Sequence, residues 1–198
     1  MSLGEDLFNK RFNKNSFINE ATDPVESKVT WLKNSLILTY DESLALVQMT
    51  KSLNGSLLYR ATRDGFTAEA FHLKCDGKEN TITIIKNNLN FVFGGYLFEG
   101  ITSSNGWGVD SRAFIFSLRR LGVTNCLKFM VTDANHAIYG HSGLGPTFGQ
   151  GIDICIKDNS NINTGSYTNF SCSYESPREF LSKGQHSKLF LQENLING

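Results

Sequence analysis

Several side chains in this sequence are of types that carry catalysis, but their spacing does not form a known active site. His141 and Ser142 could act as base and nucleophile. An orienting carboxylate could come from Asp133, Asp153 or Asp158. However, adjacent residues on an extended chain point to opposite faces, so the pair would meet only in a special turn. Since the G-x-S-x-G pattern of a hydrolase elbow is also absent from the sequence, we predict a non-enzymatic protein with no catalytic residue.

The glycine-rich stretch 140–151 has the composition of a phosphate-binding loop, with five Gly in twelve residues. It lacks the G-x-x-x-x-G-K-S/T spacing and the strand-to-helix context of such loops. In addition, Pro146 removes a backbone donor directly after Gly145. We therefore expect no cofactor here, and predict a compact glycine-dependent turn that allows Phe148 to fill the core.

One pair of residues has a spacing that can hold a metal ion. His72 and Cys75 are three apart, which places them on one face of a helix. Two further ligands would have to come from His136, His141 or the other Cys, and nothing in the sequence brings these together. We therefore predict no metal site.

The four cysteines leave a redox role open. They show no C-x-x-C pattern, so neither a zinc ribbon nor a thioredoxin-like motif is present. Their apolar or strand-like neighbours favour buried, reduced thiols. A thiol that consumes oxidants would need exposure and a nearby cation that lowers its pKa. The candidates for this alternative are Cys75, Cys126, Cys155 and Cys172.

Composition limits the class of protein and its partners. The 198 residues suffice for one domain with an extension, and 15 Phe, 6 Tyr and 18 Gly favour a β-rich fold. The formal net charge is zero and the strongest basic cluster is the pair Arg119 and Arg120, so no nucleic-acid partner is expected. No apolar run reaches about 18 residues and the start lacks a signal-peptide core, which predicts a soluble cytoplasmic protein without direct membrane insertion.

Helices are expected in the first part of the chain. Residues 1–24 could be a tail or a fraying helix, and a short amphipathic helix is predicted from Pro24 to about Lys33. Thr39 and Glu42 have the spacing of a capping box, which predicts a second helix to about Leu53. No flexible linker follows, so we expect an extension, residues 1–54, that packs on the main domain, residues 55–198.

The stretch 57–78 organises the rest of the chain. It predicts a strand over residues 57–61, a turn at Asp64 and Gly65, and a helix capped by Thr67 with Phe66 and Phe71 on its buried face. Gly77 is placed to adopt a left-handed conformation after this helix.

From Thr81 onwards the pattern predicts strands. Residues 81–85 and 91–98 form a predicted hairpin, in which Gly94 and Gly95 mark a bulge or a close backbone approach. A long loop, residues 99–111, carries Trp107. Regularly spaced strands indicate an α+β, mainly β fold: a two-sheet antiparallel β-sandwich with a few short helices at its margin and an N-terminal helical preface. The remaining strands are expected at residues 112–118, 127–131, 137–139, 152–156 and 188–196, with a turn at 119–125.

The sequence resembles a known family over residues 55–197. The matching segments occur in the family's order: Leu57–Phe66 with Phe71-His72 and Cys75-Asp76, Thr81–Lys86, Phe93–Tyr96, Ala113–Leu118, Gly145–Gly149, Asp158–Asn163 with Ser166-Tyr167, Phe180-Leu181 and Phe190–Ile196. They are similar to the TLDc domain of oxidation-resistance proteins. The segment after Gly151 and the helical preface resemble the version in protist-like sequences.

The resemblance implies a two-sheet β core and a non-enzymatic regulatory role in resistance to oxidative stress. Several family members bind the vacuolar-type proton ATPase, so it also implies a monomeric module recruited to endomembranes through that pump. On this hypothesis the loops 99–111 and 140–151 form part of a partner surface that includes Trp107, His141 and Leu144. It predicts that Trp107 or Leu144 is exposed and that no polar pocket converges there. The oxidant-consuming thiol protein is the alternative.

Overall fold

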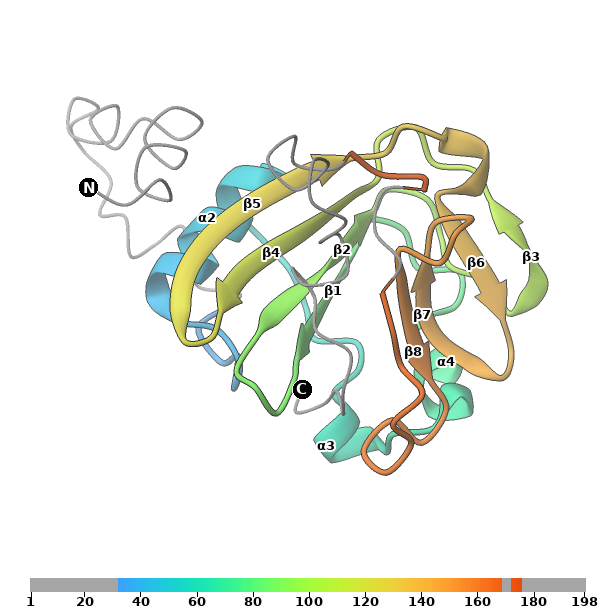
Figure 1. Cartoon of the computed structure of the whole chain (residues 1–198), viewed down its shortest axis with the longest axis horizontal. Coiled ribbons are helices and arrows are strands. Elements are labelled where there is room, and N and C mark those ends of the chain that lie inside the picture. The colour runs from blue at the N-terminus through green and yellow to red at the C-terminus, as the bar shows by residue number, and fades with distance from the viewer. Residues whose placement is uncertain (1–31, 169–171, 176–198) are drawn as a thin grey trace.

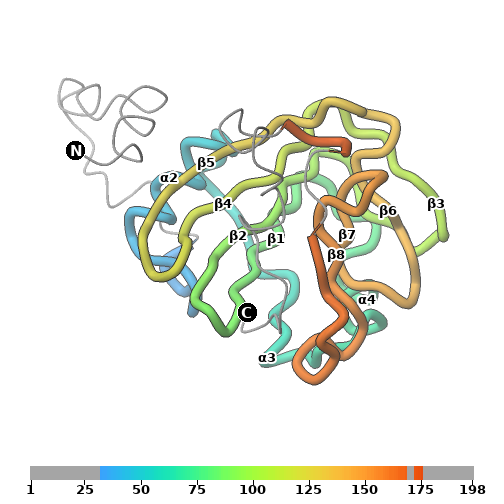
Figure 2. Tube along the Cα trace, in the orientation of Figure 1, coloured from blue at the N-terminus to red at the C-terminus, as the bar shows by residue number. Residues whose placement is uncertain are grey.

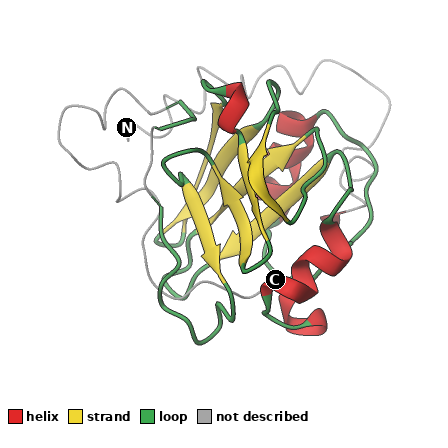
Figure 3. Ribbon diagram, turned by 90° about the vertical axis from the view of Figure 1, so that its right-hand side faces the viewer, coloured by secondary structure: helices red, strands yellow, loops and turns green. Residues whose placement is uncertain are grey.

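The computed structural model describes residues 32–168 and 172–175. The expected tail 1–24, nearly all of the helix expected at 24–33, and the strand expected at 188–196 lie outside these residues. Within them, the helices are few and short, and they lie at the margin of the strands (Figure 3). They are α2 (Tyr40–Thr50), α3 (Ala61–Asp64), α4 (Ala68–Cys75) and the single-turn 3-10 helix η3 (Ala134–His136).

The strands form two four-stranded antiparallel sheets, which confirms the predicted mainly β two-sheet fold (Figure 1). The first has the order β1-β2-β4-β5, with β1 (Thr81–Lys86), β2 (Val92–Leu97), β4 (Phe114–Arg120) and β5 (Val123–Met130). The second has the order β3-β6-β7-β8, with β3 (Ser104–Gly108), β6 (Ile138–His141), β7 (Leu144–Phe148) and β8 (Ile154–Lys157). In sequence order, β3 follows β2 and precedes β4. Since β2 and β4 belong to the first sheet and β3 belongs to the second, the chain crosses from the first sheet to the second and back (Figure 2).

The first sheet is buried on both faces. Along β4, Ile115 belongs to the core between the sheets, whereas Phe114, Phe116 and Leu118 belong to a second core that includes side chains of α2. Because both faces are covered, β4 is buried at nearly every position instead of every second one. The core between the sheets also holds Phe93, Phe148 and Ile154, which have at most 1% of their surface exposed.

The capping box that begins α2 is confirmed. Thr39 Oγ1 accepts the backbone N–H of Glu42 at 3.3 Å, and Glu42 Oε2 accepts that of Thr39 at 2.8 Å. The helix ends at Thr50, three residues before the predicted Leu53, because Lys51 takes a left-handed conformation with φ 58° and donates its N–H to Val47. The box therefore marks the start of α2 correctly, while its end depends on a local backbone reversal.

The predicted strand at residues 57–61 is wrong. Arg60 is extended, but within the described residues no strand pairs with this segment, and a strand needs a ladder partner for its backbone groups. The chain instead turns into α3, whose first turn is held by Asp64 Oδ2, which accepts the N–H of Arg60 at 2.8 Å. The Arg63 guanidinium and this backbone N–H both stabilise the carboxylate, so the pKa of Asp64 falls to about 2.

The helix after the turn is confirmed. Thr67 Oγ1 accepts the N–H of Ala70 at 3.1 Å, α4 ends at Cys75, and Gly77 has φ 71°. Phe71 is buried as predicted, whereas Phe66 is only half-buried.

Two predicted loops contain strands, and one predicted turn is shorter than expected. Residues 99–111 include β3, and residues 140–151 include β7, which pairs with β6 and β8 and so is no compact turn. Their glycines let neighbouring strands approach closely. Because glycine has no side chain, these residues also interrupt the apolar alternation by which a strand is recognised in a sequence. The turn expected at 119–125 is the two-residue connection Leu121 and Gly122, with φ 48° and 82°. Positive φ at both positions is typical of a tight hairpin.

Candidate partner-binding surface

An aromatic row lies on the outer face of the second sheet. Trp107 of β3 is directly opposite Tyr139 of β6, with ring centroids 4.6 Å apart. His136 packs edge-on against the same Trp107 ring at 5.2 Å, and His141 follows Tyr139 at 5.8 Å. Ile138 belongs to the core, so its neighbour Tyr139 faces away from it. We call His136, Trp107, Tyr139 and His141 the aromatic row.

The row lies at an edge of the fold. β3 is the outermost strand of its sheet, Trp107 has 41% of its surface exposed, and Val109 beside it has 59% exposed. β3 approaches β6 closely, since a Cβ at Gly108 would lie 2.6 Å from Cγ2 of Ile138. The buried carboxylate of Asp110 then holds the end of this segment. It accepts the backbone N–H groups of Phe98 at 2.7 Å and Arg112 at 2.9 Å.

The predicted surface residues are brought together only in part. Trp107 and His141 share one face through Tyr139. Leu144 begins the next strand, opposite Lys157, and is half-buried. The expectation that Trp107 or Leu144 is exposed is met by Trp107. Sequence reasoning missed Tyr139 and the role of His136, although the alternation of Ile138 and Tyr139 was a usable signal for the former.

The residues that were considered as catalytic candidates make hydrogen bonds to other groups and do not form a catalytic site together. His141 Nδ1 accepts the N–H of Gly143 at 3.0 Å, and the N–H of Ser142 bonds to Asn105. Asp133 contacts His136 at 2.7 Å. Asp153 accepts the N–H groups of Cys172 and Ser173, and Asp158 accepts that of Ala68. The three carboxylates therefore act as backbone or ring partners at separate places in the fold.

The side chains of His72 and Cys75, which have the spacing of metal ligands, point in different directions. Cys75 lies in the core between the sheets, while His72 contacts Asp76 and two carbonyl oxygens. In residues 32–168 and 172–175, no three His, Cys, Asp or Glu side chains cluster in a way that could hold a metal ion.

The structure places three of the candidate thiols in the interior. Burial raises the pKa of Cys75 to about 11 and that of Cys126 to about 12, and it also raises the pKa of Cys155. Cys172 is exposed, but partial desolvation and the charge of Asp153 raise its pKa as well. A reactive thiol needs a lowered pKa, and none of the four has one.

We expect the native protein to react with a thiol reagent such as DTNB at Cys172 alone, and more slowly than free cysteine does at pH 7. A raised pKa lowers the thiolate fraction at a given pH, and the other three thiols are buried. The measurement is the release of thionitrobenzoate over time, with Cys172→Ser as the variant and guanidinium-unfolded protein as the control in which every thiol reacts. Reaction of Cys172→Ser at the native rate would contradict this expectation.

A groove of about 900 Å³ lies beside β1, the edge strand of the first sheet. It is lined by β1, by the segment 54–61 before α3, and by Phe71 and Cys75 of α4. Thr81 Oγ1 in β1 is buried and has no hydrogen-bond partner among the described residues. Sequence reasoning gave no sign of this groove, since it depends on the unpaired segment that was predicted to be a strand.

The family model of the TLDc domain matches residues 32–193, which is more than half of the chain. The protein therefore belongs to the TLDc domain family. The match begins before α2, which packs on the first sheet. A comparison with curated proteins gave no match. Among the described residues, no helix is long and apolar enough to cross a membrane.

Proposed function

We propose that this TLDc domain protein is a non-enzymatic regulatory module in the response to oxidative stress, and that it acts by docking on the vacuolar-type proton ATPase. Family membership supports the regulatory role. The pump enters through the resemblance to family members that bind it. On this proposal the protein is cytoplasmic and reaches endomembranes through its partner.

The observation that carries the docking proposal is the exposed aromatic row. Trp and Tyr are enriched among the residues that dominate binding energy at protein interfaces. Here a half-exposed Trp107 is held by Tyr139 and His136 on a rigid sheet edge, so little conformational entropy would be lost on binding. The alternative role, consumption of oxidants by thiols, has no comparable support because the pKa of each thiol is raised.

Replacing Trp107 with Ala is expected to weaken binding to the purified peripheral sector of the pump by about 30-fold or more, the effect of losing a central anchor of about 2 kcal/mol. Binding of the full chain is measured by biolayer interferometry. The matched control is Val123→Ala, because Val123 is 68% exposed on the hairpin of the other sheet. Absence of wild-type binding would reject the pump as partner, and equal binding of both variants would reject the aromatic row as the surface.

A further inference from the structure

His72 joins α4 to the hairpin that connects β6 and β7. It is buried, with 8% of its surface exposed. Its Nε2 lies 2.9 Å from the carbonyl oxygen of His141 and 2.9 Å from that of Leu144, at the two ends of the hairpin turn. Its Nδ1 lies 2.7 Å from Oδ1 of Asp76, one turn further along the chain. A single imidazole therefore holds the turn at both ends.

These contacts fix the protons on the ring. A carbonyl oxygen can only accept a hydrogen bond, so Nε2 must carry a proton. An ionised carboxylate can also only accept, so Nδ1 must carry a second proton. A neutral imidazole has one proton for the two positions. If the neutral ring carries its proton on Nε2, the Nδ1 lone pair faces the Asp76 carboxylate. If the ring carries its proton on Nδ1, both hydrogen bonds to the carbonyl groups are lost.

The other charged groups around the ring do not replace this proton. Glu69, on the same face of α4, lines a small cleft with His72 and Asp76, and it adds a second negative charge. The Cys75 thiol has a pKa of about 11, so it stays neutral in the range where histidine changes charge. On the hairpin side, the His141 ring faces Gly143, and Lys157 lies opposite Leu144 on β8. Leu73, Ser103 and Ser142 complete the cleft and carry no charge.

We propose that His72 and Asp76 form a proton-operated latch on the hairpin turn 141–144. With the extra proton bound, α4 holds both ends of the turn. When that proton is lost, the attraction between Nδ1 and Asp76 becomes a repulsion and the turn is released. The three contacts together require the protonated ring, so we expect the turn to be held while that proton is bound and to be released once it is lost.

The latch has a consequence for docking, and this part rests on the proposed function. His141 is one end of the aromatic row, and its carbonyl group is one of the two that the latch holds. Binding through the row is therefore expected to weaken by about threefold or more between pH 6 and pH 8. The latch itself is a property of the free chain and does not depend on any partner.

The decisive variant is Asp76→Asn. An amide can donate its N–H to the Nδ1 lone pair, so the neutral Nε2–H form of His72 would keep both carbonyl contacts at every pH. The matched control is Glu69→Gln, which removes a negative charge from the same cleft but leaves the contact between Nδ1 and Asp76 in place.

The test is an NMR titration of the ¹³C-labelled full chain from pH 5 to 8.5, following the His72 ring and the carbonyl carbons of residues 141 and 144. His141→Gln is used as the background, since it removes a second imidazole that lies on the same hairpin as the two carbonyl groups. We expect the carbonyl signals to move together with His72 in this background and with Glu69→Gln, and to stay constant with Asp76→Asn. Carbonyl signals that stay constant while His72 titrates, or that move equally in Asp76→Asn, would overturn the latch.

A binding titration separates the two proposals. The wild-type chain should lose affinity for the peripheral sector of the pump as pH rises, while Asp76→Asn should not. If neither chain binds at any pH, the docking proposal fails and the NMR result alone decides the latch. If both bind with no dependence on pH while the carbonyl signals move, the latch holds and its control of docking is rejected.

Discussion

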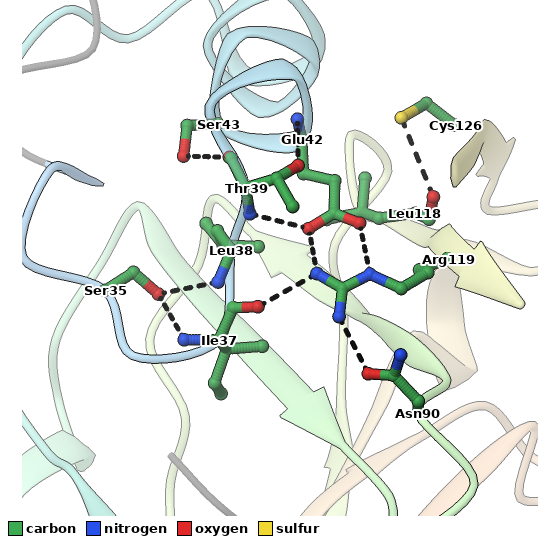
Figure 4. A network of polar contacts seen from close by, with 10 residues as sticks. All are labelled: Ser35, Ile37, Leu38, Thr39, Glu42, Ser43, Asn90, Leu118, Arg119 and Cys126. Carbon is green, nitrogen blue, oxygen red and sulfur yellow. Dashed lines mark hydrogen bonds and ion pairs between the residues drawn. The ribbon is translucent and has the colours of Figure 1, made fainter. Parts of the chain in front are cut away.

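Replacing Arg119 with Ala is expected to lower the free energy of unfolding by about 3–5 kcal/mol, the cost of removing one partner from a buried ion pair. Arg119 Nε lies 2.7 Å from Oε1 of Glu42, and Nη2 lies 2.6 Å from Oε2 (Figure 4). The Glu42 side chain is fully buried and that of Arg119 is 9% exposed. Without the guanidinium, an ionised carboxylate would remain in the core beneath α2.

The loss would extend beyond the pair itself. Arg119 also donates to the carbonyl oxygen of Ile37 at 3.0 Å and to Oδ1 of Asn90 at 2.8 Å (Figure 4). Glu42 is in turn the capping-box residue of α2, and its Oε2 accepts the N–H of Thr39. One guanidinium therefore holds the segment before α2, the first turn of α2 and the β1–β2 connection against β4.

The effect is measured by urea unfolding followed by circular dichroism. Arg120→Ala is the matched control, because Arg120 is the next residue on β4 and is only half-buried. We expect it to change stability by about 0.5 kcal/mol or less, as surface substitutions do. A double variant, Glu42→Leu with Arg119→Met, should recover much of the lost stability, since apolar residues can replace a buried pair. Equal stability of Arg119→Ala and Arg120→Ala would show that the pair does not anchor α2.

Local chemistry explains which parts of the fold the sequence predicts well. The capping box of Thr39 and Glu42, the cap at Thr67 and the positive φ of Gly77 each depend on residues within about four positions. The β1–β2 hairpin also has a short connection. Patterns of this kind need no knowledge of distant segments, so the starts of α2 and α4 were predicted to the residue.

The features that the sequence did not predict depend on contacts between residues far apart in the chain. Residues 57–61 have strand composition, but a strand also needs a partner, and none lies among the described residues. Glycines and Pro146 interrupt the alternation of β3 and β7, which become strands only through their pairing with β6 and β8. In the sequence Arg119 was notable only as half of a basic pair, yet its side chain is buried and paired with Glu42, 77 positions away.

In the candidate site, too, the sequence predicts what local residues determine but not what distant contacts determine. Trp107 could be singled out because it lies in the long predicted loop 99–111, but Tyr139 and His136 join it only through the register of β3 with β6. His72 was weighed as a metal ligand by its spacing from Cys75. Its actual partners include two carbonyl groups about 70 positions away, which no local pattern announces.

Replacing Gly95 with Ala is expected to lower the free energy of unfolding by about 1–3 kcal/mol, the usual cost of forcing extra volume into a packed core. Gly95 lies in β2 of the first sheet, and a Cβ there would come within 2.4–2.5 Å of ring atoms of Phe148, in β7 of the second sheet. Phe148 is fully buried, so its ring has no free space to move into. The close approach predicted at Gly95 thus lets Phe148 fill the core between the sheets.

A double-mutant cycle separates this clash from any general cost of Ala in a strand. Phe148→Ala alone should cost about 3–5 kcal/mol through the cavity it leaves. In that background, the methyl group of Gly95→Ala would enter the cavity, so the second substitution should cost nothing or stabilise the protein, which gives a coupling energy of about 1–3 kcal/mol. Gly106→Ala serves as the control, because its nearest contact is Ser104 Oγ at 3.8 Å and little change is expected. If Gly95→Ala cost the same with and without the Phe148 ring, its effect would come from the backbone of β2 and not from a clash with Phe148.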